Sequence, residues 1–239
     1  MIVENLKLKT WSFRQVEGSL QLPPGIFAEM LAAPIDVLPE FEGSPNMGTR
    51  TPRGKDHPRY GRMIYALART LQPKLIVEVG TSAGGTAVAW AKYLHENGSG
   101  RLVCVDNNSY AKGVYPDVTE RNLRRVGLAS DRYELLSGDS RELVPRLAQD
   151  LKEQVDAYLV DGDHTYAGAL ADMEDGLPML KQGGIMAVHD VDRGRRMREA
   201  TTEHPYPVYE AFMDFTHKHD FNWCILKFIR KHLGIISVS

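Results

Sequence analysis

Two short segments of this sequence bring carboxylates and imidazoles close together. The segment VDGDHTY contains Asp161, Asp163 and His164, and the segment VHDVD contains His189 and Asp190. Each segment begins at the end of an apolar run with the length of a β-strand, and the carboxyl ends of neighbouring parallel strands meet at one edge of a sheet. We therefore expect these side chains to share one cleft. A histidine there can act as a general base, with a carboxylate to orient its ring.

A glycine-rich turn follows another apolar run, in the stretch VEVGTSAGG from Val77 to Gly85. Gly80 and Gly84 permit a tight turn and the close approach of a ligand to the backbone. No lysine follows Gly84, which excludes a phosphate-binding P-loop. The spacing also departs from the GxGxxG pattern of dinucleotide folds, and the carboxylate of Glu78 would repel a pyrophosphate. A cofactor that carries positive charge, such as S-adenosylmethionine, fits these residues better.

Two further carboxylates follow the next two apolar runs. Asp106 ends the run RLVCVD, where it can accept hydrogen bonds from both hydroxyls of a ribose. The alternative for Asp106 is a turn or helix cap. Asp139, in SGDS, is placed to contact an adenine amino group, but with Glu142 it also fits a capping box at a helix start.

Alternating apolar and amphipathic segments predict the elements that hold these residues in place. The predicted strands span 75–79, 101–105, 133–137, 157–160 and 184–188. Their spacing leaves room for one crossover helix each time, which is typical of a doubly wound, mostly parallel α/β sheet. Helical periodicity predicts helices over 60–71 and 166–180, the second with Asp172 on its polar side and Gly183 and Gly184 as its stop.

The two ends of the chain break this alternation. The β-rich runs 222–229 and 234–239 are separated by only a few residues, which favours an antiparallel hairpin at the edge of a seven-stranded sheet. Residues 1–57 are rich in Pro, Gly and charge, so we expect an irregular arm with a short helix that covers the sheet or a neighbouring subunit. The main domain is expected over residues 58–239.

Composition narrows the class of protein further. The 239 residues suffice for one large α/β domain, and a net charge of -2 argues against a nucleic-acid partner. Cys104 and Cys224 lie in apolar stretches without metal-binding spacing, which indicates reduced, buried thiols. No apolar run has the length of a membrane span, and the first residues lack a secretory signal. We expect a cytoplasmic homo-oligomer without a membrane partner.

Together these motifs resemble those of the class I S-adenosylmethionine-dependent methyltransferases. VEVGTSAGG is similar to the family's first glycine motif, VCVD to its second-strand acid, GDS to its third-strand acid and the terminal hairpin to its seventh strand. Residues 155–191 resemble the small-molecule O-methyltransferases of the macrocin, cephalosporin-biosynthesis and catechol types. The resemblance covers about residues 60–239 and implies a Rossmann-like domain with a cofactor site formed by Glu78, Gly80, Thr81, Ser82, Gly84, Asp106, Asn107, Asp139, Ser140 and Asp161.

The resemblance also implies a candidate metal site. In the metal-dependent catechol-type enzymes an Asp follows the fourth strand and an Asp-Asn pair follows the fifth. Here Asp161 matches the first position, whereas His189 and Asp190 replace the pair. Such ligands permit Mg²⁺, and the histidine favours softer ions such as Mn²⁺, Fe²⁺ or Zn²⁺. The alternative is metal-free catalysis, in which His189 or His164 takes the proton of an acceptor hydroxyl.

The sequence therefore predicts a methyltransferase that acts on a small molecule, preferentially at oxygen, in secondary or specialised metabolism. The alternatives are a catalytically silent cofactor-binding or cofactor-biosynthesis protein and an NAD-dependent oxidoreductase. Four arginines after the fifth strand would suit an anionic acceptor, although such a charge run also forms a solvated face. They are Arg193, Arg195, Arg196 and Arg198. His57 and Tyr60 are expected to contact the same cleft.

Overall fold

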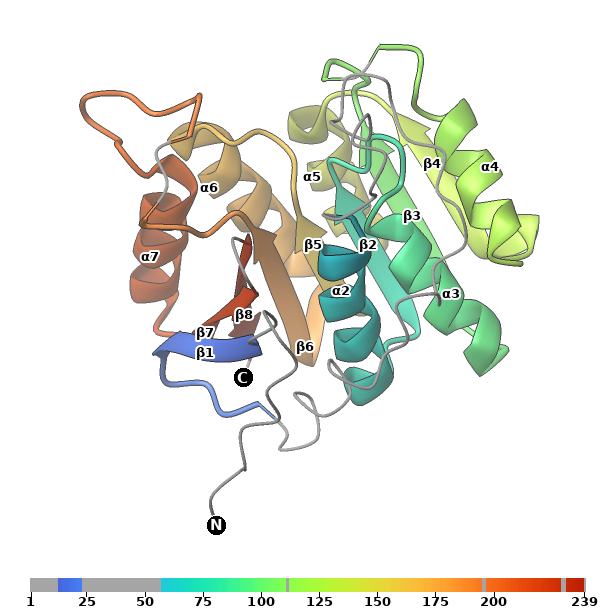
Figure 1. Cartoon of the computed structure of the whole chain (residues 1–239), viewed down its shortest axis with the longest axis horizontal. Helices are drawn as coiled ribbons and strands as arrows, with labels where there is room; N and C mark the ends of the chain where they lie inside the picture. Colours follow the sequence, from blue (N-terminus) through green and yellow to red (C-terminus); the bar gives the residue numbers. More distant parts are fainter. Residues whose placement is uncertain (1–12, 23–56, 111, 195–196, 229–230, 239) are drawn as a thin grey trace.

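The computed structural model describes residues 13–22, 57–110, 112–194, 197–228 and 231–238 (Figure 1). Within these residues, eight strands form one sheet in the order β1-β7-β8-β6-β5-β2-β3-β4. The parallel part consists of β2 (Leu75–Val79), β3 (Arg101–Asp106), β4 (Tyr133–Ser137), β5 (Val155–Val160) and β6 (Leu180–His189). The prediction of a mostly parallel α/β sheet is confirmed.

An antiparallel part completes the sheet beyond β6. As predicted, β7 (Asn222–Phe228) and β8 (Lys231–Ser237) form an antiparallel pair, and β8 also pairs with β6. The hairpin is not at the edge, because β1 (Phe13–Gly18) pairs antiparallel with β7 and raises the strand count from seven to eight. The expectation of an irregular arm is wrong for this segment. The rest of the predicted arm, with its short helix, lies outside the described residues.

Helices cover both faces of the sheet (Figure 1). One face carries α2 (His57–Leu71), α3 (Ala87–Asn97) and α4 (Asp117–Arg125), and the other carries α5 (Ser140–Asp150), α6 (Tyr166–Gly176) and α7 (Pro207–His219). Short 3-10 turns, Ser130–Arg132 and Leu177–Met179, lead into β4 and β6. The sheet is therefore doubly wound, as predicted.

The helix predicted over residues 166–180 ends earlier than expected. It stops at Gly176, and Pro178 lies in the 3-10 turn that follows. Proline has no amide hydrogen with which to continue an α-helix, so the chain turns into β6 before it reaches the two glycines. Gly183 and Gly184 thus lie inside β6 and are not a helix stop.

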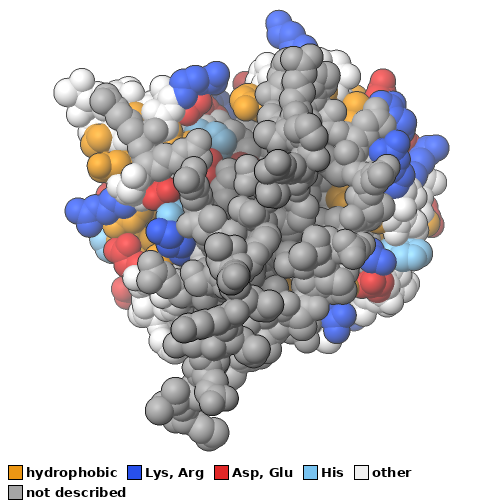
Figure 2. Space-filling view, viewed as in Figure 1, with side chains coloured by type: hydrophobic (Ala, Val, Ile, Leu, Met, Phe, Trp, Pro, Cys, Tyr) orange, Lys and Arg blue, Asp and Glu red, His pale blue; other side chains and the backbone are white. Residues whose placement is uncertain are grey.

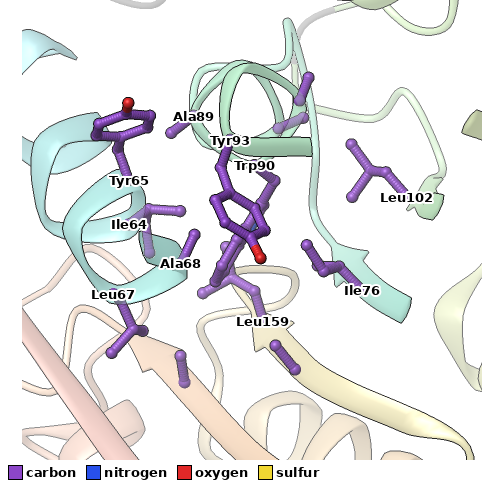
Figure 3. Close-up of a cluster of buried hydrophobic side chains, with 14 of the residues drawn as sticks. Ile64, Tyr65, Leu67, Ala68, Ile76, Ala89, Trp90, Tyr93, Leu102 and Leu159 are labelled. Carbon is purple, nitrogen blue, oxygen red and sulfur yellow. The ribbon is translucent and has the colours of Figure 1, made fainter. Parts of the chain in front are cut away.

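The core beneath α2 and α3 fixes the position of β2. Figure 3 shows Ile64 and Leu67 of α2 near Trp90 of α3, together with Ile76 and Leu159 of the sheet. All five side chains are fully buried. Truncation of a buried Trp or Leu typically costs about 2–5 kcal/mol of stability, so this packing holds the end of β2 firmly in place.

The surface and the cysteines agree with the compositional expectations. Cys104 and Cys224 are both free and buried. No helix in the described part of the chain has the length and apolar character needed to cross a membrane. On the described surface in Figure 2, basic and acidic side chains are interspersed, in keeping with the small net charge.

Candidate functional site

The glycine turn at the end of β2 touches the end of the neighbouring strand β5. Gly80 has a left-handed backbone with a φ of 82°, and its amide donates to the carbonyl of Val105 at 2.9 Å. A Cβ at this position would lie 1.9 Å from the carbonyl oxygen of Asp161. The sequence predicted that something lies very close to the backbone of Gly80. In the structure this neighbour is the protein's own backbone at Asp161. This contact places the turn directly beside Asp161.

Gly80→Ala is expected to lower the free energy of unfolding by about 2–5 kcal/mol, because it adds backbone strain and a clash with Asp161. Gly183→Ala is the matched control, since Gly183 also has a positive φ, of 77°, but no atom of the described residues lies within 4 Å of the added methyl group. We expect this control to lose only about 1–2 kcal/mol. Denaturant unfolding measures both variants, and equal losses would refute the packing argument.

Two buried polar residues of α4 donate hydrogen bonds to the glycine turn. The hydroxyl of Thr119 donates to the carbonyl of Ser82 at 2.5 Å, and the side-chain amide of Asn122 donates to the carbonyl of Ala83 at 2.8 Å. A Cβ on Gly84 would lie 3.1 Å from the Thr119 methyl group. Sequence reasoning missed both anchors. Their only signal is two polar residues on the buried side of a short helix.

Asp106 lies at the end of β3, as predicted, and its carboxylate also accepts a hydrogen bond from the glycine turn. Its Oδ2 accepts from the amide of Ser82 at 2.7 Å, and its Oδ1 accepts from the amide of Asn108 at 2.6 Å. Burial raises the pKa of Asp106, and these two amides oppose that shift. Each carboxylate oxygen retains a lone pair, so the turn-cap role is present and the ribose role stays a prediction. Asn107 is exposed and accepts from the amide of Ser109 at 3.0 Å.

Glu78 is a fully buried carboxylate in β2. Its Oε1 accepts from the hydroxyl of Thr86 at 2.8 Å, whereas its Oε2 has no hydrogen-bond partner among the described residues. Burial raises the pKa of Glu78 to about 8, against the effect of Thr86, and the negative charges of Asp161 and Asp106 contribute to the rise. Thr81 is likewise buried in the turn. A positive group near Glu78 would therefore stabilise its ionised form.

Asp161 brings the predicted catalytic residues together. It follows β5, and its Oδ1 lies 2.5 Å from Nδ1 of His189 at the end of β6 and 3.2 Å from Nε2 of His164. Although burial alone would raise the pKa of Asp161, the facing His189 and His164 lower it well below its usual range. The predicted convergence of the two segments after β5 and β6 is present in the structure.

The carboxylates around His164 increase the basicity of its ring. Burial lowers the pKa of His164, but Asp161, Asp190 and Glu199 outweigh burial, and the net shift is upward. Asp190 has a left-handed backbone with a φ of 56°, and its Oδ1 lies 3.4 Å from Nε2 of His189. Asp161, His164 and His189 form a group whose ligand atoms all lie within 4.8 Å of one another. This group has His164 where the predicted metal set had Asp190.

The start of α5 holds the residues predicted to meet adenine. Asp139 is the N-cap, and its side chain accepts from the amide of Arg141 at 3.0 Å, so the capping role is present while the adenine role stays a prediction. Ser140 interacts with the carboxyl of Asp172 on α6. The sequence placed Asp172 on the polar side of its helix, but it is buried, and burial raises its pKa to about 6. A Cβ on Gly162 would lie 2.6 Å from its Oδ2, so Asp172 supports the loop that begins at Asp161.

The arginines after β6 are only partly described. The guanidinium of Arg193 lies over the ring of Tyr209, 6.0 Å from its centroid, and Arg198 pairs with Glu199 at 3.1 Å. Arg198 is 82% exposed, which favours the solvated-face interpretation for this residue. Arg195 and Arg196 lie outside the described residues, as do the side chains of His57 and Tyr60. Their predicted contacts with an acceptor stay predictions.

The open sheet, the glycine turn after β2 and the acids after β3 and β5 define an arrangement of the class I methyltransferase type. Residues 77–191, just under half of the chain, match the profile of a family described as "Methyltransferase domain". The predicted resemblance to S-adenosylmethionine-dependent methyltransferases is confirmed.

Individual relatives agree with this assignment. A provisionally named O-methyltransferase of Mycobacterium sp. (strain JLS) is 29% identical over 143 residues, 60% of each chain. Rhamnosyl O-methyltransferase of Mycobacterium bovis (strain BCG / Pasteur 1173P2) is 28% identical over 160 residues, 63% of this chain and 60% of that protein. The chain thus spans about 60% of the length of the curated relatives it matches. The solved O-methyltransferase from Bacillus cereus in complex with SAH shares the fold, with a TM-score of 0.59 and 18% identity over 89% of this chain and 88% of that chain.

Proposed function

We propose that the protein transfers a methyl group from S-adenosylmethionine to an oxygen of a small-molecule acceptor. The supporting observation is the contact between the glycine turn and the acid-histidine cluster, because Gly80 packs against the backbone of Asp161. A cofactor seated on the turn is then next to the side chains that activate the acceptor. The names of the two mycobacterial relatives support oxygen as the methylated atom.

The residues divide between binding the cofactor and activating the acceptor. Asp106 is proposed to accept from the ribose hydroxyls and Glu78 to face the positive end of the cofactor, while Asp139 and Ser140 border the adenine. These assignments rest on the position of Asp106 at the end of β3, on Asp139 as the N-cap of α5 and on the full burial of Glu78. Nicotinamide dinucleotides are disfavoured, since the turn departs from the GxGxxG spacing of dinucleotide folds and a buried acid offers no favourable charge to a pyrophosphate.

The acceptor hydroxyl must lose its proton as the oxygen attacks the methyl group in line with the sulfonium. His164 is the better placed ring to take that proton, since 28% of its side chain is exposed, compared with 10% for His189. Asp161 holds both rings and stabilises the imidazolium that forms. The same three side chains have the donor types to hold a divalent ion, which would supply Lewis acidity that lowers the pKa of the hydroxyl.

Ligand-dependent melting separates this function from its alternatives. S-adenosylmethionine or S-adenosylhomocysteine at about 100 times its dissociation constant should stabilise the folded chain by about 2.7 kcal/mol, while NAD should give no shift. Asp106→Asn should weaken the binding of both S-adenosylmethionine and S-adenosylhomocysteine. A shift with NAD alone would favour an oxidoreductase, and cofactor binding without formation of S-adenosylhomocysteine from any hydroxylated acceptor would favour a silent binder.

The proposed setting of the reaction is a cytoplasmic homo-oligomer that acts on an acceptor of specialised metabolism, with anionic acceptors among the first to test. Light scattering on the purified chain reads its oligomeric state. The acceptor preference is measured with a screen of hydroxylated small molecules, half of which carry a carboxylate or phosphate. The amount of S-adenosylhomocysteine formed with each compound is compared.

A further inference from the structure

Asp172 is a buried carboxylate that the proposed mechanism does not use. It lies on α6 and is 2% exposed, whereas acidic side chains are almost never buried without a partner. The hydroxyl of Tyr158 on β5 donates to the backbone carbonyl of Asp172 at 2.9 Å. A Cβ on Gly176 would lie 2.1 Å from the ring of Tyr158, so this ring fills the space between β5 and α6. The backbone that carries the carboxyl group of Asp172 is therefore held firmly against the sheet.

The carboxyl group of Asp172 meets two segments that follow different strands. Ser140, the first residue of α5 after β4, interacts with it through its hydroxyl. Gly162, in the loop after β5, also lies against it, because a Cβ on Gly162 would be 2.6 Å from Oδ2 of Asp172. The carboxyl group therefore connects the start of α5 with the loop that carries Asp161 and His164.

These two segments flank the proposed cofactor site. In the sheet, β2 and β3 lie between β5 and β4. The glycine turn follows β2, and Asp106 ends β3. In the proposed function, the start of α5 borders the adenine, and the loop after β5 lies at the end of the cofactor that gives up its methyl group. Asp172 is placed to keep both ends of the cofactor site at a fixed spacing.

We propose that Asp172 is a positioning residue for methyl transfer, which holds the start of α5 in register with the loop of Asp161 and His164. The inference rests on the proposed function, because it concerns the spacing between the cofactor and the groups that activate the acceptor. A displacement of about 1 Å between reacting groups can cost about 100-fold in rate. Asp172 acts through the two segments and is not itself a catalytic residue.

An ion pair between the same two segments is a weaker link. The guanidinium of Arg141, at the start of α5, lies 3.5 Å from the carboxylate of Asp163 in the loop after β5. Both side chains are exposed, and exposed ion pairs contribute little because water and salt screen them. The buried contacts of Asp172 are therefore expected to dominate the connection.

The charge of Asp172 strengthens its contact with Ser140. Burial and the negative charges of Asp163, Asp175 and Asp139 raise the pKa of Asp172 to about 6, while Ser140 opposes the rise. Above about pH 7 the carboxyl group is mostly ionised. Removal of the Ser140 hydroxyl would take a partner from a buried charge, which is costly. The start of α5 is thus attached to α6 by this contact as well as by apolar packing.

Steady-state kinetics of the full chain with an active acceptor distinguish positioning from stability. Asp172→Ala removes both contacts and should raise the KM for S-adenosylmethionine about tenfold and lower kcat about tenfold. Asp172→Asn keeps the shape and an acceptor oxygen, so it should retain most of the activity. Loss of stability alone would reduce the amount of folded enzyme, which lowers the apparent kcat but leaves KM unchanged. Circular dichroism confirms that each variant is folded, and Asp172→Ser replaces Asp172→Ala if the latter is not.

Two double variants test the two contacts separately. Ser140→Ala should weaken the binding of S-adenosylhomocysteine, measured by calorimetry, but should weaken it no further in the Asp172→Ala background, because both changes remove the same contact. Gly162→Ala should lower the denaturant midpoint by a larger amount in the wild type than in Asp172→Ala, which leaves room for the added methyl group. Asp175→Asn is the matched control, because it removes a carboxylate one turn further along α6, and its KM and kcat should equal those of the wild type.

Three results would overturn the inference: an unchanged KM for S-adenosylmethionine in Asp172→Ala, additive effects of Ser140→Ala and Asp172→Ala on ligand binding, or equal midpoint losses from Gly162→Ala in both backgrounds. If the wild type binds S-adenosylhomocysteine and methylates an acceptor while Asp172→Ala behaves like Asp175→Asn, only the positioning inference fails. If the wild type binds neither S-adenosylhomocysteine nor S-adenosylmethionine, the proposed function fails, and the positioning inference fails with it.

Discussion

Asp161→Asn is expected to reduce kcat/KM for methyl transfer by roughly 10²–10⁴-fold. Asp161 contacts both imidazoles through the same oxygen, so the substitution removes the one charge that His164 and His189 share. The loss is expected whether the cluster acts through a histidine base or through an ion, because both require an ionised carboxylate at this point. The formation of S-adenosylhomocysteine, followed by chromatography with an active acceptor, measures the effect.

A titration provides a second measurement that needs no acceptor. Asp161 is the main cause of the raised pKa of His164, which burial opposes. In the metal-free Asn variant we therefore expect the pKa of His164 to fall below its value in the wild type, as read from the ring protons by NMR. Asp175→Asn, which removes a carboxylate from α6 outside the cluster, should change neither the rate nor this pKa. A wild-type rate in Asp161→Asn would remove Asp161 from the mechanism.

The central strands could be predicted because strands buried on both faces read as continuous apolar runs. The bounds of β2 and β4 match the sequence prediction, and β3, β5 and β6 differ at their ends. β1 could not be recognised in the same way. Its sequence, FRQVEG, mixes charged and apolar residues, as an edge strand with a solvated side can, and its pairing with β7 joins residues some two hundred positions apart.

The residues of the candidate site also differ in how far the sequence could predict their positions. Asp161 and His189 could be placed together because each lies at the end of one of two adjacent strands. The approach of His164 depends on the loop conformation, and the hydrogen bonds of Thr119 and Asn122 to the glycine turn depend on how α4 packs. Neither has a local sequence pattern. The burial of Asp172 was mispredicted because helical periodicity alone assigns a charged residue to the solvent side.

Glu78 makes the stability of the unliganded protein depend on pH. Its pKa is about 8 in the folded chain, compared with an ordinary value of 4.5, so the folded state holds this proton more tightly than the unfolded state does. The stabilisation is complete below about pH 4.5 and is lost as the pH rises through about 8, at up to about 1.4 kcal/mol per pH unit. Glu78→Gln stays neutral and can still accept from Thr86, so its free energy of unfolding should exceed that of the wild type at pH 8. Denaturant unfolding from pH 5 to 8.5 measures the difference.

Binding of S-adenosylmethionine should release the proton from the buried carboxyl group of Glu78. A positive group near Glu78 favours the carboxylate, so binding at pH 7 is expected to release between about 0.5 and 1 proton per site. Calorimetric titrations in buffers of different ionisation enthalpy count that proton. Glu78→Gln should release none and should bind the cofactor at least about tenfold more weakly, because it cannot become negative. If the variant released as many protons as the wild type, they would come from another group, and Glu78 would have no contact with the charged end of the cofactor.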